Sequence, residues 1–191
     1  MKVLLLSAVL GLLYAGHGEA QLLLKPFSGK WKTHYIAASN KDKITEGGPF
    51  HVYIRHVEFH ANNTVDIDFY VKSDGECVKK QVTGVKQKFF VYQVEYAGQN
   101  EVRILHLSRD AIIVSIHNVD EEGKETVFVA IIGKRDRISY LDNWKFKKET
   151  EDRGIPEENI VNFSDNDSLR PVTSSSAWNQ DQQHKDDFPA S

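Results

Sequence analysis

Two pairs of side chains in this sequence could carry chemistry. Ser115 and His117 place a hydroxyl two residues from an imidazole, a pairing that nucleophilic hydrolases use. His56 and His60 are two imidazoles, the side chain found most often among metal ligands. On one extended strand, however, residues four apart are separated by about 13 Å, which is too far for both to bind one ion.

Neither pair has the further group that its chemistry needs. No acidic residue lies beside Ser115 and His117 in the sequence to orient the imidazole for proton transfer. We therefore expect no catalytic residues, no metal site and no cofactor. A hydrolase or isomerase that uses Ser115 and His117 is the least favoured alternative.

The sequence contains a single cysteine, Cys77, among its 191 residues. One thiol excludes a disulfide framework and a zinc site built from several thiolates. We expect Cys77 to form no disulfide and to have no role. A disulfide between Cys77 and a second chain is the alternative.

Charge and length exclude further classes of protein. The 24 basic and 27 acidic residues give a net charge of -3. This balance lacks the basic excess of a nucleic-acid-binding protein, so no nucleic acid partner is expected. A chain of this length corresponds to one domain, and its 40% of hydrophobic residues suffices for a core.

The N-terminus is typical of a secretory signal peptide. An apolar stretch over residues 3–13 follows Lys2 and precedes small residues around Ala20. Cleavage after Ala20 would remove residues 1–20 and release a secreted, extracellular protein. The stretch is short for a bilayer span, and no second one follows in the sequence, so no membrane contact is expected. Secreted chains can be glycosylated, and three acceptor motifs begin at Asn62, Asn162 and Asn166.

The middle of the chain alternates between apolar and polar residues. This period of two predicts strands with one buried face and one solvated face. Eight strands joined by short turns are expected over residues 29–38, 49–60, 64–73, 76–86, 89–97, 100–107, 111–119 and 125–133. Parallel strands would need long crossovers between them, and the sequence has none there. The prediction is an all-β, eight-stranded antiparallel up-and-down barrel, whose closure removes exposed sheet edges.

A helix is predicted after the last strand, packed on the outside of the barrel. Ser139 is a suitable N-cap and Gly154 a suitable stop, which places the helix over residues 139–153. Ile138, Leu141 and Trp144 share one face of it, and residues 156–160 predict one more turn. The barrel and helix then occupy residues 21–169. The polar, aperiodic residues 170–191 are expected to be a disordered tail.

Several motifs point to one family. Gly29-Lys30-Trp31 opens the first predicted strand, and residues 150–160 read TEDRGIPEENI. With Gly75-Glu76-Cys77 and Gly133-Lys134-Arg135, they make residues 24–168 resemble the lipocalin family, in particular the mammalian odorant-binding proteins and their aphrodisin, probasin and urinary-protein relatives. The resemblance implies that Trp31 plugs the closed end of the barrel under a basic side chain, either Lys134 or Arg135.

The sequence departs from the family at one disulfide. The family usually ties the cysteine at the position of Cys77 to a second cysteine near the C-terminus, and Leu169 or a neighbour stands there instead. Such a bridge is commonly worth about 2–4 kcal/mol, so the C-terminal segment is expected to be held less firmly.

A closed barrel of eight strands can enclose one small ligand. A bulge in the strand 49–60 is expected to bring Val57 to the interior. The other inward-facing residues, and therefore the expected ligand-binding residues, are Phe50, Val52, Ile54, Val65, Ile67, Phe69, Val82, Tyr92, Val94, Tyr96, Val102, Ile104, Ile113, Ser115, His117, Phe128, Ala130 and Ile132. The polar groups among them are Tyr92, Tyr96, Ser115 and His117.

The resemblance implies a secreted carrier that reversibly binds small hydrophobic molecules, such as odorants or pheromones. A mostly apolar wall with one or two polar anchors suits such ligands. A cell-surface receptor and a second copy in a homodimer are the candidate protein partners. The alternative is a protein-interaction lipocalin whose interior is filled by Phe50, Phe69, Tyr92 and Phe128.

Overall fold

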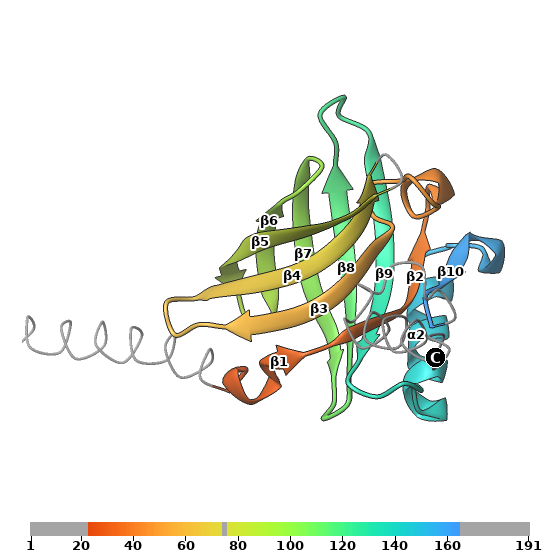
Figure 1. Cartoon of the computed structure of the whole chain (residues 1–191). Helices are drawn as coiled ribbons and strands as arrows, with labels where there is room; N and C mark the ends of the chain where they lie inside the picture. The colour runs from red at the N-terminus through yellow and green to blue at the C-terminus, as the bar shows by residue number, and fades with distance from the viewer. Residues whose placement is uncertain (1–22, 74–75, 165–191) are drawn as a thin grey trace, which may run out of the picture.

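The computed structural model describes residues 23–73 and 76–164. The expected signal peptide, the expected polar tail and Asn166 lie outside these residues. Within them, one antiparallel sheet curls around an interior, and a single α-helix packs against its outer side (Figure 1). The expected all-β architecture with an outer helix is confirmed.

The sheet contains ten strands in the order β1-β3-β4-β5-β6-β7-β8-β9-β2-β10. Between β3 and β9 every strand pairs with its neighbour in the sequence, as an up-and-down meander requires. The strands are β1 (Gly29–Lys30), β2 (Lys32–Ala38), β3 (Val52–Phe59), β4 (Thr64–Ser73), β5 (Glu76–Lys88), β6 (Val91–Glu95), β7 (Gln99–Leu107), β8 (Ala111–Val119), β9 (Glu125–Gly133) and β10 (Ile160–Asn162).

The first expected strand is split in two, and this split closes the barrel. β1 pairs with β3, whereas β2, only one residue later, pairs with β9 at the far end of the meander. Trp31 lies between them, and its amide donates to the Arg55 carbonyl at 3.1 Å. The Thr33 hydroxyl accepts from the Ile54 amide at 2.8 Å, where the two ends of the sheet meet. One continuous segment thus satisfies both edges of the meander.

The expected bulge in β3 is present. The register between β3 and β4 shifts between Ile54 and His56. Because the extra residue reverses the side-chain alternation, Val57 returns to the interior face, where it is buried. β3 begins only at Val52, since the residues before it fold into a loop over one end of the barrel.

The helix α2 (Tyr140–Glu151) begins after Ser139, whose hydroxyl accepts from the Asp142 amide at 3.1 Å. Its buried side chains are Phe146 and Thr150, and Phe146 stacks on Tyr35 of β2 at 5.8 Å between ring centroids. The face expected from the sequence is therefore wrong: Leu141 is 58% exposed and Trp144 is 51% exposed. The helix is only weakly amphipathic, so its packing on the sheet, rather than its own pattern, decides which face is buried.

The segment after α2 returns to the sheet. A 3-10 turn, η3 (Glu157–Asn159), lies where an extra turn was expected, and it leads into β10, which pairs with β2. The sequence does not predict β10, because three residues are too few to show an alternating pattern. In the part of the chain that the structure describes, no helix is long and apolar enough to cross a membrane.

Candidate functional site

The interior of the barrel contains a cavity of about 160 Å³. Strands β2 to β9 all contribute to its wall, and the wall surface is apolar. The inward-facing residues expected from the sequence line it at Phe50, Val52, Ile54, Val65, Ile67, Phe69, Val82, Tyr92, Val94, Tyr96, Val102, Ile104, Phe128, Ala130 and Ile132.

The expected residues on β8 are wrong. Ile113, Ser115 and His117 face outward, and the wall is formed by Ile112, Val114 and Ile116 instead. Ile113 is buried under α2 in a cluster with Phe146, whereas His117 is exposed, with Nε2 at 3.2 Å from Glu125 Oε2. Both faces of β8 carry apolar residues, because its inner face lines the cavity and part of its outer face, at Ile113, packs against α2. The outward face carries Ser115 and His117 in its middle, whereas the inward face has a polar residue only at Asn118, near the end of the strand. That difference could have identified the inner face.

Four other wall residues were not expected from the sequence. They are Thr33, Ile36, Phe59 and Asn100. Thr33 and Asn100 are polar, so alternation of apolar residues gives no reason to place them inside. Both side chains form hydrogen bonds to the backbone, Thr33 to the Ile54 amide and Asn100 to nearby carbonyls. These bonds satisfy their polar atoms, so both residues can stand in an apolar wall.

The polar groups of the wall that could anchor a ligand are bonded to the protein. Tyr96 donates its hydroxyl to the Pro49 carbonyl at 2.7 Å, and burial raises the pKa of this tyrosine. The side-chain amide of Asn100 donates to the carbonyls of Val94 at 3.1 Å and Tyr96 at 2.8 Å. The Asn100 Oδ1 accepts from Asn118 at 3.0 Å. The wall therefore offers a bound molecule apolar contact and shape.

The closed end of the barrel is plugged by Trp31. This side chain is 1% exposed, and its Nε1 donates to the Phe27 carbonyl at 2.9 Å, at the end of the 3-10 turn η1 (Lys25–Phe27). Lys134 lies over the indole, with Nζ 4.9 Å from the ring centroid. Of the two expected basic partners, Lys134 is thus the one in contact, whereas Arg135 pairs with Asp110 at the surface at 3.1 Å.

The other end of the barrel is covered by residues 39–51, which we call the lid. The lid contains the 3-10 turn η2 (Lys41–Lys43) and connects β2 to β3. It places Phe50 over the cavity, where this ring packs on Phe128 at 4.4 Å and against Tyr96 at 5.5 Å between centroids. Tyr96 in turn meets Phe69 at 5.0 Å. All four rings also line the cavity.

The remaining candidate residues lie on the outer surface. His56 pairs with Glu58 at 3.3 Å and His60 pairs with Asp66 at 2.8 Å, so the two histidines have separate partners. Across residues 23–73 and 76–164, no group of three or more side chains is arranged to hold a metal ion. Cys77 is exposed at the start of β5.

Two of the three glycosylation motifs can be placed. Asn62 is exposed at the tip of the β3–β4 hairpin, and its Oδ1 accepts from the Thr64 hydroxyl at 2.6 Å. Asn162 is exposed in β10, and its Oδ1 accepts from the Ser164 amide at 2.8 Å. Ser164 is also engaged by its hydroxyl, which lies 3.2 Å from His34 Nδ1.

The family model of the lipocalin and cytosolic fatty-acid binding proteins matches residues 28–167. This protein is a lipocalin. Its relatives include the odorant-binding protein of Bos taurus, 39% identical over 78% of this chain and 94% of the relative. Another is a male-specific submandibular salivary gland protein of Mesocricetus auratus, 35% identical over 88% of this chain and 98% of the relative.

Solved structures agree with this membership. A dog lipocalin allergen superposes with a TM-score of 0.73 and 38% identity, covering 76% of this lipocalin and 98% of the allergen. The bovine odorant-binding protein in complex with undecanal matches with a TM-score of 0.57 and 39% identity, covering 78% of this chain and 95% of that one.

Proposed function

We propose that this lipocalin reversibly binds small hydrophobic molecules in its barrel and carries them through a secretion. The observation that carries the proposal is the apolar cavity inside the barrel, walled by side chains from every strand from β2 to β9. The bovine relative is an odorant-binding protein, and its solved complex contains undecanal, a long-chain aldehyde. Odorants and pheromones of similar chemistry are therefore the ligands to test first.

The size of the cavity limits the ligand. An apolar cavity of roughly 150 Å³ stays dry and accepts a benzene-sized molecule, and this cavity is of that size at about 160 Å³. A longer ligand has to displace wall side chains. A ligand of ten carbons would bury roughly 300 Å², which corresponds to about 7 kcal/mol before ordering costs. We expect dissociation constants around the micromolar range.

The chemistry proposed is binding alone. Ser115 and His117 face away from the cavity, so neither can meet a molecule bound inside it. One chain walls the cavity with its own strands, and binding therefore needs no second copy. Secretion is proposed from the signal-like N-terminal sequence and from the gland named for the hamster relative. A receptor as protein partner rests on the family resemblance.

The test is displacement of a fluorescent apolar probe, 1-aminoanthracene, from the mature protein. Filling the cavity with Val102→Phe should abolish probe binding, since Val102 lies in the wall on β7. Glu101→Phe introduces the same ring one residue away, at an exposed position, and should leave binding unchanged. Val114→Phe repeats the test from β8, in case the first variant fails to fold.

A folded wild-type protein that binds neither the probe nor any competitor would refute the proposal. That result would favour the second candidate, a protein-interaction lipocalin. The specific observation behind that candidate is that Phe50, Phe69, Tyr92 and Phe128 all reach into the interior and leave only a small volume.

A further inference from the structure

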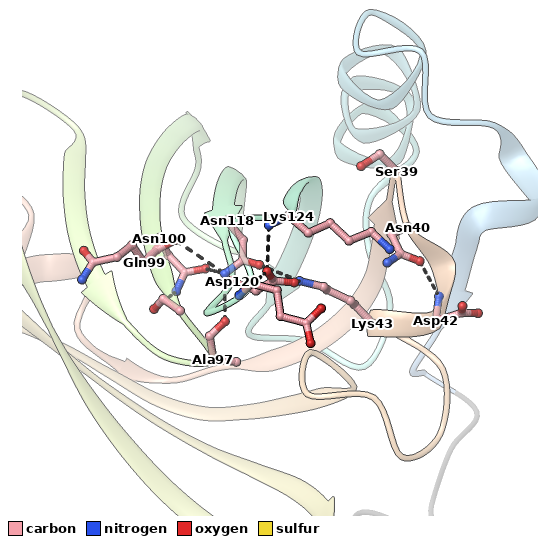
Figure 2. A network of polar contacts seen from close by, with 12 residues as sticks. Ser39, Asn40, Asp42, Lys43, Ala97, Gln99, Asn100, Asn118, Asp120 and Lys124 are labelled. Carbon is pink, nitrogen blue, oxygen red and sulfur yellow. Dashed lines mark hydrogen bonds and ion pairs between the residues drawn. The ribbon is translucent and has the colours of Figure 1, made fainter.

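The lid is fastened to the rim of the barrel on three sides. Lys43 reaches the turn between β8 and β9, where its Nζ donates to Asp120 Oδ2 at 2.8 Å (Figure 2). The Pro49 carbonyl accepts the Tyr96 hydroxyl beside the end of β6. Glu46 pairs with Lys72 near the end of β4. A ligand entering through the mouth must break such contacts or pass between them.

The contact through Lys43 is the best shielded of the ion pairs that hold the lid. The side chains of Lys43 and Asp120 are 13% and 22% exposed, whereas Glu46 is mostly exposed. Ion pairs at exposed positions contribute little, because water competes for both charges. The hydrogen bond from Lys43 also holds the pKa of Asp120 below its usual value, together with amide donors from Lys124 and Glu122. Asp120 therefore stays charged and keeps its ion pair with Lys43.

A chain of buried amides connects Lys43 to the cavity wall. The Lys43 ammonium also donates to Asn118 Oδ1 at 3.0 Å. Asn118 is 0% exposed and donates to the Ala97 carbonyl at 3.1 Å and to Asn100 Oδ1 at 3.0 Å. Figure 2 shows these side chains in one row along the rim, from the lid to the turn that contains Ala97. Removing Lys43 would leave acceptors on Asp120 and Asn118 without their charged donor.

The lid is held together by hydrogen bonds between its own residues. The Phe50 amide donates to the Lys43 carbonyl at 2.8 Å, and His51 Nδ1 donates to the Ile44 carbonyl at 2.8 Å. Gly48 permits this compact path, since a Cβ there would lie 2.4 Å from the Asp42 carbonyl oxygen. Phe50, which covers the cavity, is thus tied directly to the residue that holds the rim.

We propose that Lys43 and Asp120 form a latch that sets how fast apolar ligands enter and leave the barrel. Neither residue lines the cavity, so the latch makes no contact with the ligand. If the lid is closed both with and without ligand, weakening the latch raises the open population of both states by the same factor. Association and dissociation then accelerate together, and the dissociation constant does not change. Lys43 is a positioning residue in this scheme, and the part that concerns ligands rests on the proposed function.

The test compares Lys43→Met with the wild-type protein by stopped-flow fluorescence of 1-aminoanthracene. We expect both rate constants to rise about tenfold, which is the low end of the contribution of a hydrogen bond to a charged group, with a dissociation constant within about twofold. Asp120→Asn should act in the same direction, since it removes the charge but keeps an oxygen for the turn. Lys43→Arg should restore slow exchange. Lys147→Met removes a lysine of α2 that forms an exposed ion pair with Glu157 of η3, and it should change neither rate.

Hydrogen exchange of the Phe50 amide in the ligand-free protein gives a second readout. Lys43→Met keeps the carbonyl that binds this amide, so faster exchange would report lid opening and not a lost acceptor. Faster exchange in a protein that binds no probe would support the latch and refute the carrier function. Unchanged exchange and unchanged rates would overturn the latch. So would a weaker affinity caused by dissociation alone, because that pattern belongs to a residue that contacts the ligand.

Discussion

A single hydroxyl on the ligand should weaken binding to this lipocalin. The wall of the cavity is apolar, and the hydroxyl of Tyr96 and the amide of Asn100 are already bonded to backbone carbonyls. A ligand hydroxyl would leave water and find no ready partner. Burying a hydroxyl without a hydrogen bond costs about 1–3 kcal/mol in proteins, which corresponds to about a fivefold to 150-fold loss of affinity.

The assay compares two ligands of equal size, butylbenzene and 3-phenylpropan-1-ol, in which a terminal methyl is replaced by a hydroxyl. Both would displace 1-aminoanthracene, and the alcohol should need the higher concentration by the factor above. Tyr96→Phe should leave the ratio of the two affinities unchanged, because the Tyr96 hydroxyl is held by Pro49.

An alcohol that binds as tightly as the hydrocarbon would refute this reasoning. If Tyr96→Phe then weakened the alcohol selectively, the Tyr96 hydroxyl would be an anchor that leaves Pro49 when ligand binds. Unselective loss of both ligands would instead show that the variant had disturbed the lid.

Three further predictions concern stability and modification. Trp31→Ala should lower the free energy of unfolding in urea by about 3–5 kcal/mol, whereas Lys134→Met, which removes an exposed cation from the same indole, should cost about 1 kcal/mol or less. Burial holds the pKa of His34 in the folded protein below its ordinary value of 6.5, so the unfolded chain takes up a proton first as the pH falls. The free energy of unfolding should therefore fall as the pH drops below about 6.5 and level off below the folded pKa. His34→Gln should flatten this slope in unfolding curves measured between about pH 5 and 7.5. Expression in secretory cells should give a glycan at Asn62 on the exposed hairpin tip. Treatment with a glycosidase should then lower the mass of the wild-type protein and of Asn162→Gln, but not the mass of Asn62→Gln.

The strands of the barrel can be predicted from the sequence because each strand shows its own alternation of apolar and polar residues. In β4, residues such as Val65 and Ile67 alternate with Asp66 and Asp68, and the alternation alone states which side chains face inward. The same rule fails on β8, where Ile112 faces the cavity and Ile113 faces α2. Apolar residues stand on both faces of this strand, and each face also carries polar residues, so alternation marks the outside only weakly. The neighbouring elements then decide which face turns inward.

The helix shows the same limit. Leu141 and Trp144 form the more apolar side of α2 in the sequence, yet both are exposed, and Phe146 is the side chain buried against Tyr35. The position of the helix is fixed by the short connection from β9 and by the return of β10 to β2. Those constraints act through the chain path and cannot be read from the pattern within the helix.

The sequence by itself determined the strands, the direction of most of their side chains and the family, because each of these depends on residues close together in the chain. Only the tertiary structure decided how the sheet closes, how much space the cavity keeps and what holds the lid. Lys43 and Asp120 are 77 residues apart, and no local pattern marks either of them. They meet because β2 and β8 flank the same strand, β9, and the barrel brings their ends to one rim. Contacts of this kind exist only after folding, so the access route to the cavity is a property of the fold.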